Sequence, residues 1–588
     1  CSSDLSFVAS TIGSNVSGWV LVGITITLVA ICTFGLLFYY RENSVQWTYS
    51  IVIYIAWFLG FIGIVLYPVD IGYSINDKVA NPKLRLIWAA VYWFTFFLSW
   101  VGIPIMSEYW ASGEFKVMYR FKEALWVNAR FYIIVGLVGG IGGFLFARIS
   151  DLCDFSHCFT SSKLDSIQPL VIGLSNSYGL CFVVFLLGPG LVELPVSLWK
   201  RRDLHLYLDE LYDKVHQLDE NITNYKCEVA SIYCNLQEVK GILHSAKKSA
   251  RILGLVNDMI DSMPSSELID YDRYRVVIDK SSWIHVDLLK CVGMSDAEVL
   301  KVLSKLNSRL KRTCLIYERK LAQYDECVDE ILQTLAALGE PLLDPSTGQI
   351  ITAPVETPSL LRRVWKLVRG PTLVVAALLA GTMSLCVAVT EVTTVISNII
   401  HKPLSVFGLA LQRVSDNRGV RTFLAGIPLL YMFICFFRSF FLLRIPGVEC
   451  YHMLKRHTDV YALSFNASYL CRLQFSLCYH FFTLLQLPAS AYKSIALSAI
   501  LGQMQTVKFL GKEFNFYMPA ILVMISIFTL VRMLRKPVKK SKEALLESNE
   551  LVTCKKMVVT TVLRRQRMQR EQKEETTLHY TYTGASVA

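Results

Sequence analysis

The chain has 588 residues, of which 53% are hydrophobic and only 18% are charged. Soluble globular proteins carry about 25% charged residues, so the composition argues against an ordinary soluble enzyme. The formal net charge of +12 comes from 59 basic and 47 acidic residues. Because the basic residues gather beside long apolar runs, the charge points to a membrane protein and not to nucleic-acid binding.

Nine apolar segments are candidates for membrane-spanning helices, since about 20 apolar residues cross about 30 Å of hydrocarbon. They are residues 19–40, 47–69, 86–106, 131–146, 170–198, 372–400, 423–443, 461–487 and 518–534. The fourth and ninth segments are short, and the eighth contains Arg472 and His480. The sequence predicts an all-α polytopic membrane protein with about nine transmembrane helices in a lipid bilayer.

The distribution of Lys and Arg predicts the orientation of the chain. Counted near the segment ends, basic residues are about twice as frequent on one side of the membrane, and that side is expected to be cytosolic. The N-terminus then lies outside or in a lumen, and the C-terminus lies in the cytosol. Plasma membrane and endolysosomal membrane both fit this pattern.

Residues near the predicted outer face suggest two modifications. Cys153 and Cys158 could form a disulfide in an oxidising compartment. Together with His157 they could instead bind a metal, but the set falls short of a structural zinc site. Asn15 begins an Asn-Val-Ser sequon on the correct face for glycosylation. The chain begins at Cys1, so a cleaved signal peptide before it stays an open alternative, although the run 19–40 is too long for a signal core.

Four regions follow from these segments. Residues 1–199 form a membrane block with spans one to five, and residues 200–370 form a cytosolic insert with a linker. Residues 371–535 form a second membrane block with spans six to nine, and residues 536–588 are predicted to be a basic, disordered cytosolic tail. The tail is expected either to meet anionic lipid head groups or to be merely solvated.

The insert carries a long heptad pattern. Apolar residues spaced four and three apart run from Leu204 to Leu253, and a second such run extends from Leu303 to Leu335. Sustained apolar a and d positions predict a coiled coil, with an arm of about 75 Å. Both ends of the insert attach to the same membrane face, which favours an antiparallel hairpin within one chain over pairing between chains. The hairpin is either a structural stalk or a docking rod for a protein partner.

Motifs for catalysis or cofactor binding do not emerge from the sequence. It contains no phosphate-binding loop and no His-Glu-x-x-His metal helix. The glycine-rich run 136–143 lies within a predicted span, where glycines favour close helix packing. The Gly188-Pro189-Gly190 stretch predicts a broken or kinked helix. We therefore expect no enzyme activity, no cofactor and no metal.

Ionisable residues inside the predicted spans are the strongest functional candidates, because each costs at least a few kcal/mol unless it is paired or hydrated. They are Glu193, Glu391, Arg438, Arg472 and His480. An acid and a base from different spans could neutralise one another, and Glu391 with Arg472 is the expected pair. Each residue is either part of a structural ion pair or part of a path for a solute or ion.

Four short motifs stand out, at residues 104–115, 188–199, 458–478 and 514–519. Their characteristic residues are Pro104, Tyr109, Ser112, Gly113, Phe115, Gly188, Gly190, Pro195, Trp199, Asp459, Cys471 and Pro519. In these motifs the chain resembles the limb-region-like or lipocalin-interacting membrane receptor family, and within it the branch called limb-region domain-containing protein two. The resemblance implies nine spans, an outward N-terminus and a cytosolic coiled coil.

Two functions follow as hypotheses. In the favoured one, the protein is a receptor-like membrane protein or signalling scaffold whose coiled coil recruits cytosolic or membrane proteins. In the alternative, it is a transporter or transport subunit that passes a small solute along the intramembrane charges. Tightly packed spans with a projecting rod would favour the scaffold, whereas a polar cavity reaching Glu193 or Glu391 would favour transport.

Overall fold

The computed structural model describes residues 2–75, 80–149, 164–245, 249–264, 269, 271, 295–352, 360–400, 402–414, 417–442, 451–501, 514–535 and 544–584. The predicted disulfide pair, Cys153 and Cys158, lies outside these residues, as does most of the predicted tip of the insert. Asn15 falls within the first helix, but its side chain is outside the described set.

The first part of the chain folds into long helices that follow the predicted spans. They are α1 (Ser2–Tyr40), α2 (Trp47–Ser74), α3 (Pro82–Phe97), the π-helix η1 (Leu98–Gly102), α4 (Ile103–Ala111), α5 (Val117–Ile149) and α6 (Leu164–Lys200). Asn81 fixes the start of α3, because its side chain accepts a hydrogen bond from the Lys83 backbone and Pro82 occupies the first turn.

The second membrane part contains α12 (Leu360–Ile400), α13 (Val406–Arg413), α14 (Arg418–Leu442), α15 (Val460–Leu485), α16 (Ala489–Ser494), α17 (Ser498–Leu501) and α18 (Phe514–Arg535). The buried Asp70 of α2 ties the chain between α16 and α17 to the bundle. It accepts hydrogen bonds from the backbone N–H groups of Ala496 and Leu497, at 3.2 and 3.0 Å, and from Trp88 Nε1 at 3.1 Å.

Among the described residues, seven helices are long and apolar enough to cross a membrane. They are Val22–Tyr40, Trp47–Gly72, Pro82–Ala111, Tyr178–Lys200, Val368–Ser397, Arg418–Phe441 and Tyr517–Leu534. Two other predicted segments lie in α5 and α15. In α15, 21 of 26 residues are buried, so this helix is enclosed by protein and needs less hydropathy than a helix facing lipid.

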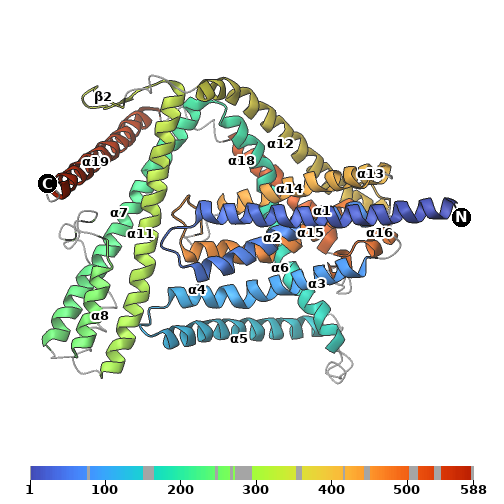
Figure 1. Cartoon of the computed structure of the whole chain (residues 1–588), viewed down its shortest axis with the longest axis horizontal. Helices are drawn as coiled ribbons and strands as arrows, with labels where there is room; N and C mark the ends of the chain where they lie inside the picture. The colour runs from blue at the N-terminus through green and yellow to red at the C-terminus, as the bar shows by residue number, and fades with distance from the viewer. Residues whose placement is uncertain are drawn as a thin grey trace.

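α6 and α15 lie at the centre of the membrane helices. α15 packs against α2, α4 and α6, and α6 also packs against α12, α14 and α18 (Figure 1). A Cβ atom at Gly190 would lie 2.1 Å from the Cys435 carbonyl oxygen of α14, so only glycine allows this approach. The sequence predicted a broken or kinked helix at residues 188–190. The helix is not broken there, because α6 continues to Lys200, and both glycines serve helix contact.

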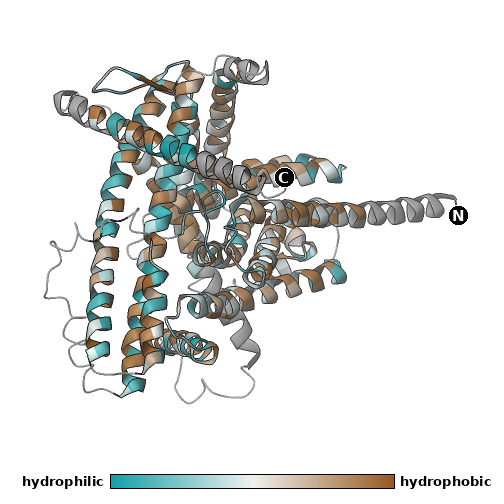
Figure 2. Cartoon of the chain, turned by 60° about the vertical axis from the view of Figure 1, so that its left-hand side comes forward, coloured by the Kyte–Doolittle hydropathy of each residue, from teal (hydrophilic) through white to brown (hydrophobic). Residues whose placement is uncertain are grey.

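The insert forms an arm, defined here as α7 (Leu204–Ser245), α8 (Ala250–Asp261) and α11 (Asp296–Leu338). α7 and α11 lie side by side and share one apolar core (Figure 1). The arm alternates apolar and polar residues, unlike the apolar bundle (Figure 2). It does not project as a free rod: it runs across one end of the membrane helices (Figure 1).

The continuous heptad helix predicted from Leu204 to Leu253 is wrong in one respect. α7 ends at Ser245, and a new helix begins at Ala250 after the extended Ser249. The core position predicted at Ala250 is exposed, and an alanine offers little apolar area to support a continuous helix.

Two segments predicted to be irregular have regular structure. Within the linker, β1 (Leu342–Leu343) and β2 (Ile350–Thr352) pair antiparallel, and Asp344 caps their turn by accepting hydrogen bonds from Ser346 and Thr347. The tail, expected to be disordered, contains the helix α19 (Ala544–Gly584). Val558, Val559 and Val562 pack into the apolar core of the arm, a contact that the basic composition of the tail did not suggest.

Candidate functional site

The first contact between the arm and the membrane helices lies at the end of α4. Asn307 Nδ2 of α11 donates to the Gly113 carbonyl at 2.8 Å, and Ser308 Oγ donates to the Ala111 carbonyl at 3.2 Å. Lys311 Nζ donates to the Ser112 carbonyl at 3.0 Å. These donors lie on one side of α11, since helix residues three and four apart share a face.

Gly113 makes this contact possible. A Cβ atom there would lie 1.9 Å from the Ser304 carbonyl oxygen and 2.6 Å from the Ser308 backbone nitrogen. Ser112 donates to the Glu123 carboxylate, which holds the loop against α5, and Phe115 packs on the apolar core of the arm. Three residues identified by the family resemblance therefore form the surface on which the arm rests.

Partial burial at this contact changes the acid–base properties of Lys311. Burial lowers the pKa of its ammonium group, and the neighbouring Arg120 lowers it further. Because burial without hydrogen bonds is costly for a charge, the Ser112 carbonyl is an important acceptor for this group.

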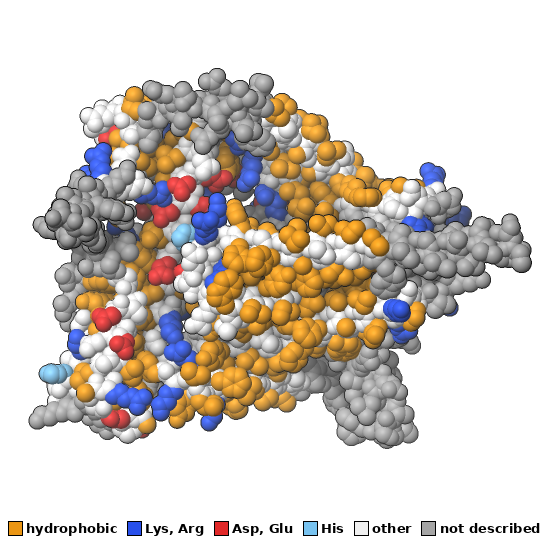
Figure 3. All heavy atoms as spheres, viewed as in Figure 1, with side chains coloured by type: hydrophobic (Ala, Val, Ile, Leu, Met, Phe, Trp, Pro, Cys, Tyr) orange, Lys and Arg blue, Asp and Glu red, His pale blue; other side chains and the backbone are white. Residues whose placement is uncertain are grey.

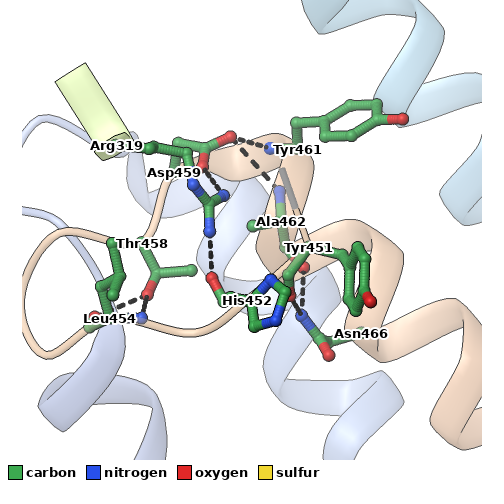
Figure 4. A network of polar contacts seen from close by, with 9 residues as sticks. All are labelled: Arg319, Tyr451, His452, Leu454, Thr458, Asp459, Tyr461, Ala462 and Asn466. Atoms are coloured by element: carbon green, nitrogen blue, oxygen red, sulfur yellow. Dashed lines mark hydrogen bonds and ion pairs between the residues drawn. The ribbon is translucent and has the colours of Figure 1, made fainter. Parts of the chain in front are cut away.

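The second contact is a buried ion pair between α11 and the start of α15 (Figure 4). Arg319 Nη1 lies 2.6 Å from Asp459 Oδ1, and the two side chains are 4% and 5% exposed. Arg319 Nη2 also donates to the His452 carbonyl. Buried pairs of this kind are stabilising only when further hydrogen bonds support the charges, and each partner makes such bonds.

Asp459 has a second role in the same place. Its Oδ2 accepts hydrogen bonds from the backbone N–H groups of Tyr461 at 2.8 Å and Ala462 at 3.2 Å, so it is the N-cap of α15 (Figure 4). One carboxylate thus starts α15, most of whose residues are buried, and binds the arm.

The loop before α15 also receives the end of α1. The Thr458 N–H donates to the Tyr40 carbonyl, and the Arg456 N–H donates to the Tyr39 carbonyl, both at 3.1 Å. The Thr458 hydroxyl donates to the Leu454 carbonyl at 2.7 Å and stiffens the loop. The arm contacts the membrane helices in two places: residues 304–311 contact residues 111–113, and Arg319 pairs with Asp459. We call these two contacts together the joint. Figure 3 shows charged side chains along the arm beside the largely apolar surface of the membrane helices.

The intramembrane candidates are distributed differently from the prediction. Glu391 of α12 pairs with His480 of α15 at 2.7 Å, and both side chains are at least 96% buried. The expected partner, Arg472, does not bind Glu391. Glu391 Oε2 has no hydrogen-bond partner among the described residues.

Arg472 instead binds the backbone beside the π-helix η1. Its Nη2 donates to the Ser99 carbonyl at 2.7 Å, and its guanidinium lies 4.3 Å from the centre of the Trp100 ring. The widened π turn alters the normal helical hydrogen bonds here, and the cation–π contact gives a charge inside the bundle a neutral partner.

Prolines release carbonyl groups that other helices bind. Pro195 has no N–H for the Leu191 carbonyl, and Ser384 of α12 donates to that carbonyl instead. Likewise Pro104 leaves the Trp100 carbonyl to Tyr132 of α5. Two more residues of the resemblance therefore act in helix–helix contact.

The remaining sequence candidates lie outside the joint. Glu193 of α6 and Arg438 of α14 lie within electrostatic range of one another. Cys471 is buried and donates to the Ala56 carbonyl at 3.3 Å. Trp199 stacks with Arg202 at 4.5 Å, and Pro519 lies inside α18.

Sequence reasoning missed the arm side of the joint. Asn307, Lys311 and Arg319 lie off the heptad seam, so they read as ordinary solvated positions. The stripe formed by Ser304, Ser308, Lys311 and Arg319 is polar, and a polar stripe on a helix is typical of a solvated face, so periodicity gave no signal for this contact.

Apolar packed helices with a polar helical arm bound across one end define a polytopic α-helical membrane protein. The family described as LMBR1-like membrane protein matches residues 18–534, and the chain belongs to this family. The predicted resemblance is thereby confirmed.

Several curated proteins are similar to the chain. LMBR1 domain-containing protein 2 homolog A of Dictyostelium discoideum is 23% identical over 77% of this chain and 58% of its own length. The chain therefore spans little more than half of that relative. G-protein coupled receptor-associated protein LMBRD2 of Homo sapiens is 22% identical over 86% of this chain and 78% of its own. The protein of the same name from Caenorhabditis briggsae is 23% identical over 81% and 76%. No solved structure matches the chain.

Proposed function

We propose that the protein is a receptor-associated membrane scaffold. It has nine spans, an N-terminus outside or in a lumen, and an arm that forms a cytosolic coiled coil for binding proteins. Relatives are named as G-protein coupled receptor-associated, and we extend that association to this chain. The proposed role is non-enzymatic.

The observation that carries the proposal is the buried pair of Arg319 and Asp459. A passive stalk would need no buried charge to bind it to the membrane helices. An arm held against the cytosolic ends of the spans would lie beside the cytosolic surface of a neighbouring receptor. The extensive aromatic packing around α15 also supports a rigid support more than a moving carrier.

Proximity labelling tests this role. A biotin ligase inserted at the exposed Gly348, in the turn between β1 and β2, should label G-protein-coupled receptors in the same membrane. Asp459→Ala, compared at equal surface expression, should reduce this labelling. The scaffold role would be contradicted if no receptor is among the labelled proteins, or if Asp459→Ala leaves the labelling of receptors unchanged.

The same position tests the orientation. An epitope tag at Gly348 should bind antibody only after the cells are permeabilised. Binding on intact cells would place the arm outside and refute the proposed topology.

A transport function is the second candidate, and the buried Glu391–His480 pair favours it. A carboxylate oxygen without a partner among the described residues is a costly feature, as expected of a site that binds a proton or ion in turn. Solute flux in liposomes that Glu391→Gln abolishes would establish transport over scaffolding.

A further inference from the structure

The tail helix α19 covers one face of the arm. Four of its side chains, Cys554, Val558, Val559 and Val562, are buried in the same apolar core as α7 and α11. Their spacing of four, one and three residues places them on one side of α19. Lys555 lies over the ring of Tyr212 in α7, at 5.9 Å.

An arginine fixes the next turns of this contact. Arg565 Nη2 binds Asp325 Oδ1 at 2.7 Å, and Nη1 binds Asp329 Oδ1 at 2.5 Å. Asp325 and Asp329 are one turn apart on α11, so one guanidinium reaches both. Between Val559 and Val562, Thr561 Oγ1 lies 3.1 Å from the Tyr324 hydroxyl.

These contacts define what the face of the arm accepts. The bound helix presents small apolar residues at positions i, i+4, i+5 and i+8 and an arginine at i+11, counted from Cys554. The face therefore fits a basic amphipathic helix, in the helix-in-groove manner, with an acidic pair at one end that sets the direction of the helix.

α19 is weakly held compared with α7 and α11. Only four of its side chains are fully buried among those described. Asp325 and Asp329 are 46% and 57% exposed, and exposed ion pairs stabilise by about 1 kcal/mol or less. By contrast, the seam between α7 and α11 buries apolar residues along the whole length of both helices.

We propose that this face of the arm is a docking site for a basic amphipathic helix of a partner protein, and that α19 is the resident occupant that the partner's helix displaces. The proposal rests on the scaffold function and specifies which surface recruits a partner and by what chemistry. Displacement exchanges one helix for another of the same pattern, so the arm itself need not change.

A labelled synthetic peptide of residues 549–571 is the probe, used with the full-length protein in detergent. The peptide should bind the double variant Val558→Asp/Val562→Asp, whose own tail is released, at least about tenfold more tightly than it binds the unaltered chain, where the tethered tail competes. Fluorescence anisotropy measures both affinities. A chain with Cys554→Asp and Val559→Asp provides a second way to release the tail, through the other two buried side chains of the contact.

Specificity is tested at the acidic pair. Adding Asp325→Asn and Asp329→Asn to the released chain should weaken peptide binding, and a peptide with Arg565→Glu should bind less well. A peptide with Arg570→Glu is the matched control and should bind normally, because Arg570 is exposed. Absence of binding to both released chains, or equal binding to released and unaltered chains, would overturn the proposal. Receptor labelling by the unaltered chain is a separate result, so the scaffold can succeed where this docking site fails.

Discussion

Arg319 and Asp459 form an ion pair between the arm and the N-cap of α15, with Nη1 and Oδ1 2.6 Å apart and both side chains almost fully buried. Because the same carboxylate caps the helix and neutralises the arginine, the start of α15 and the position of the arm depend on each other.

Removing this carboxylate should be strongly destabilising. Asp459→Ala leaves a buried arginine unpaired and α15 uncapped, so we expect the free energy of unfolding to fall by about 3–5 kcal/mol. The decrease in Tm on thermal unfolding in detergent measures this loss of stability. Asp325→Ala, at an exposed ion pair, is the control and should cost about 1 kcal/mol or less. Equal effects of the two changes would contradict the importance of the buried pair.

A methyl group at Gly113 should displace the arm. Gly113→Ala brings a Cβ atom to 1.9 Å from the Ser304 carbonyl, and we expect a loss of about 1–3 kcal/mol through forced backbone movement. Hydrogen exchange at residues 301–312 should increase. Gly241→Ala, in open space on α7, should leave exchange there unchanged. Unchanged exchange in Gly113→Ala would show that the contact is loose.

The contact between α6 and α14 should likewise not tolerate a larger side chain at Gly190. Gly190→Ala meets the Cys435 carbonyl at 2.1 Å, so the helices must separate, at a cost of about 1–3 kcal/mol. Gly381→Ala on α12 has no atom within 4 Å and is the matched control. The two Tm values are the measurement, and a Gly190→Ala protein as stable as the control would refute the close packing.

Glu391 and His480 should be energetically coupled. In a double-mutant cycle of Glu391→Gln and His480→Ala, we expect an interaction energy of about 0.5–3 kcal/mol, as for residues in direct contact. The corresponding cycle of Glu391→Gln with Arg472→Met should be close to additive, since Arg472 binds Ser99 instead. Strong coupling to Arg472 would restore the pairing expected from the sequence.

The membrane helices were predictable because hydropathy and length depend only on local sequence. The long helix around residues 461–487 was recognised despite its charges, whereas the partner of Glu391 was not, because pairing depends on which faces of α12 and α15 meet. The continuity of α6 through Pro189 was missed for a related reason: glycine and proline weaken a free helix, but contacts with α14 and α18 support this one. Motif resemblance identified Gly113 and Asp459 without indicating that α11 contacts both.

α11 is attached to the loop after α4 at Gly113 and to the N-cap of α15 at Asp459, at points about 18 Å apart along α11. A single rigid element therefore bridges membrane helices from both sides of the insert. If the helices before the insert moved relative to those after it, one of the two attachments would have to break. α11 therefore holds the two groups of helices in a fixed relative position. A force applied anywhere along α11 would be transmitted to both groups.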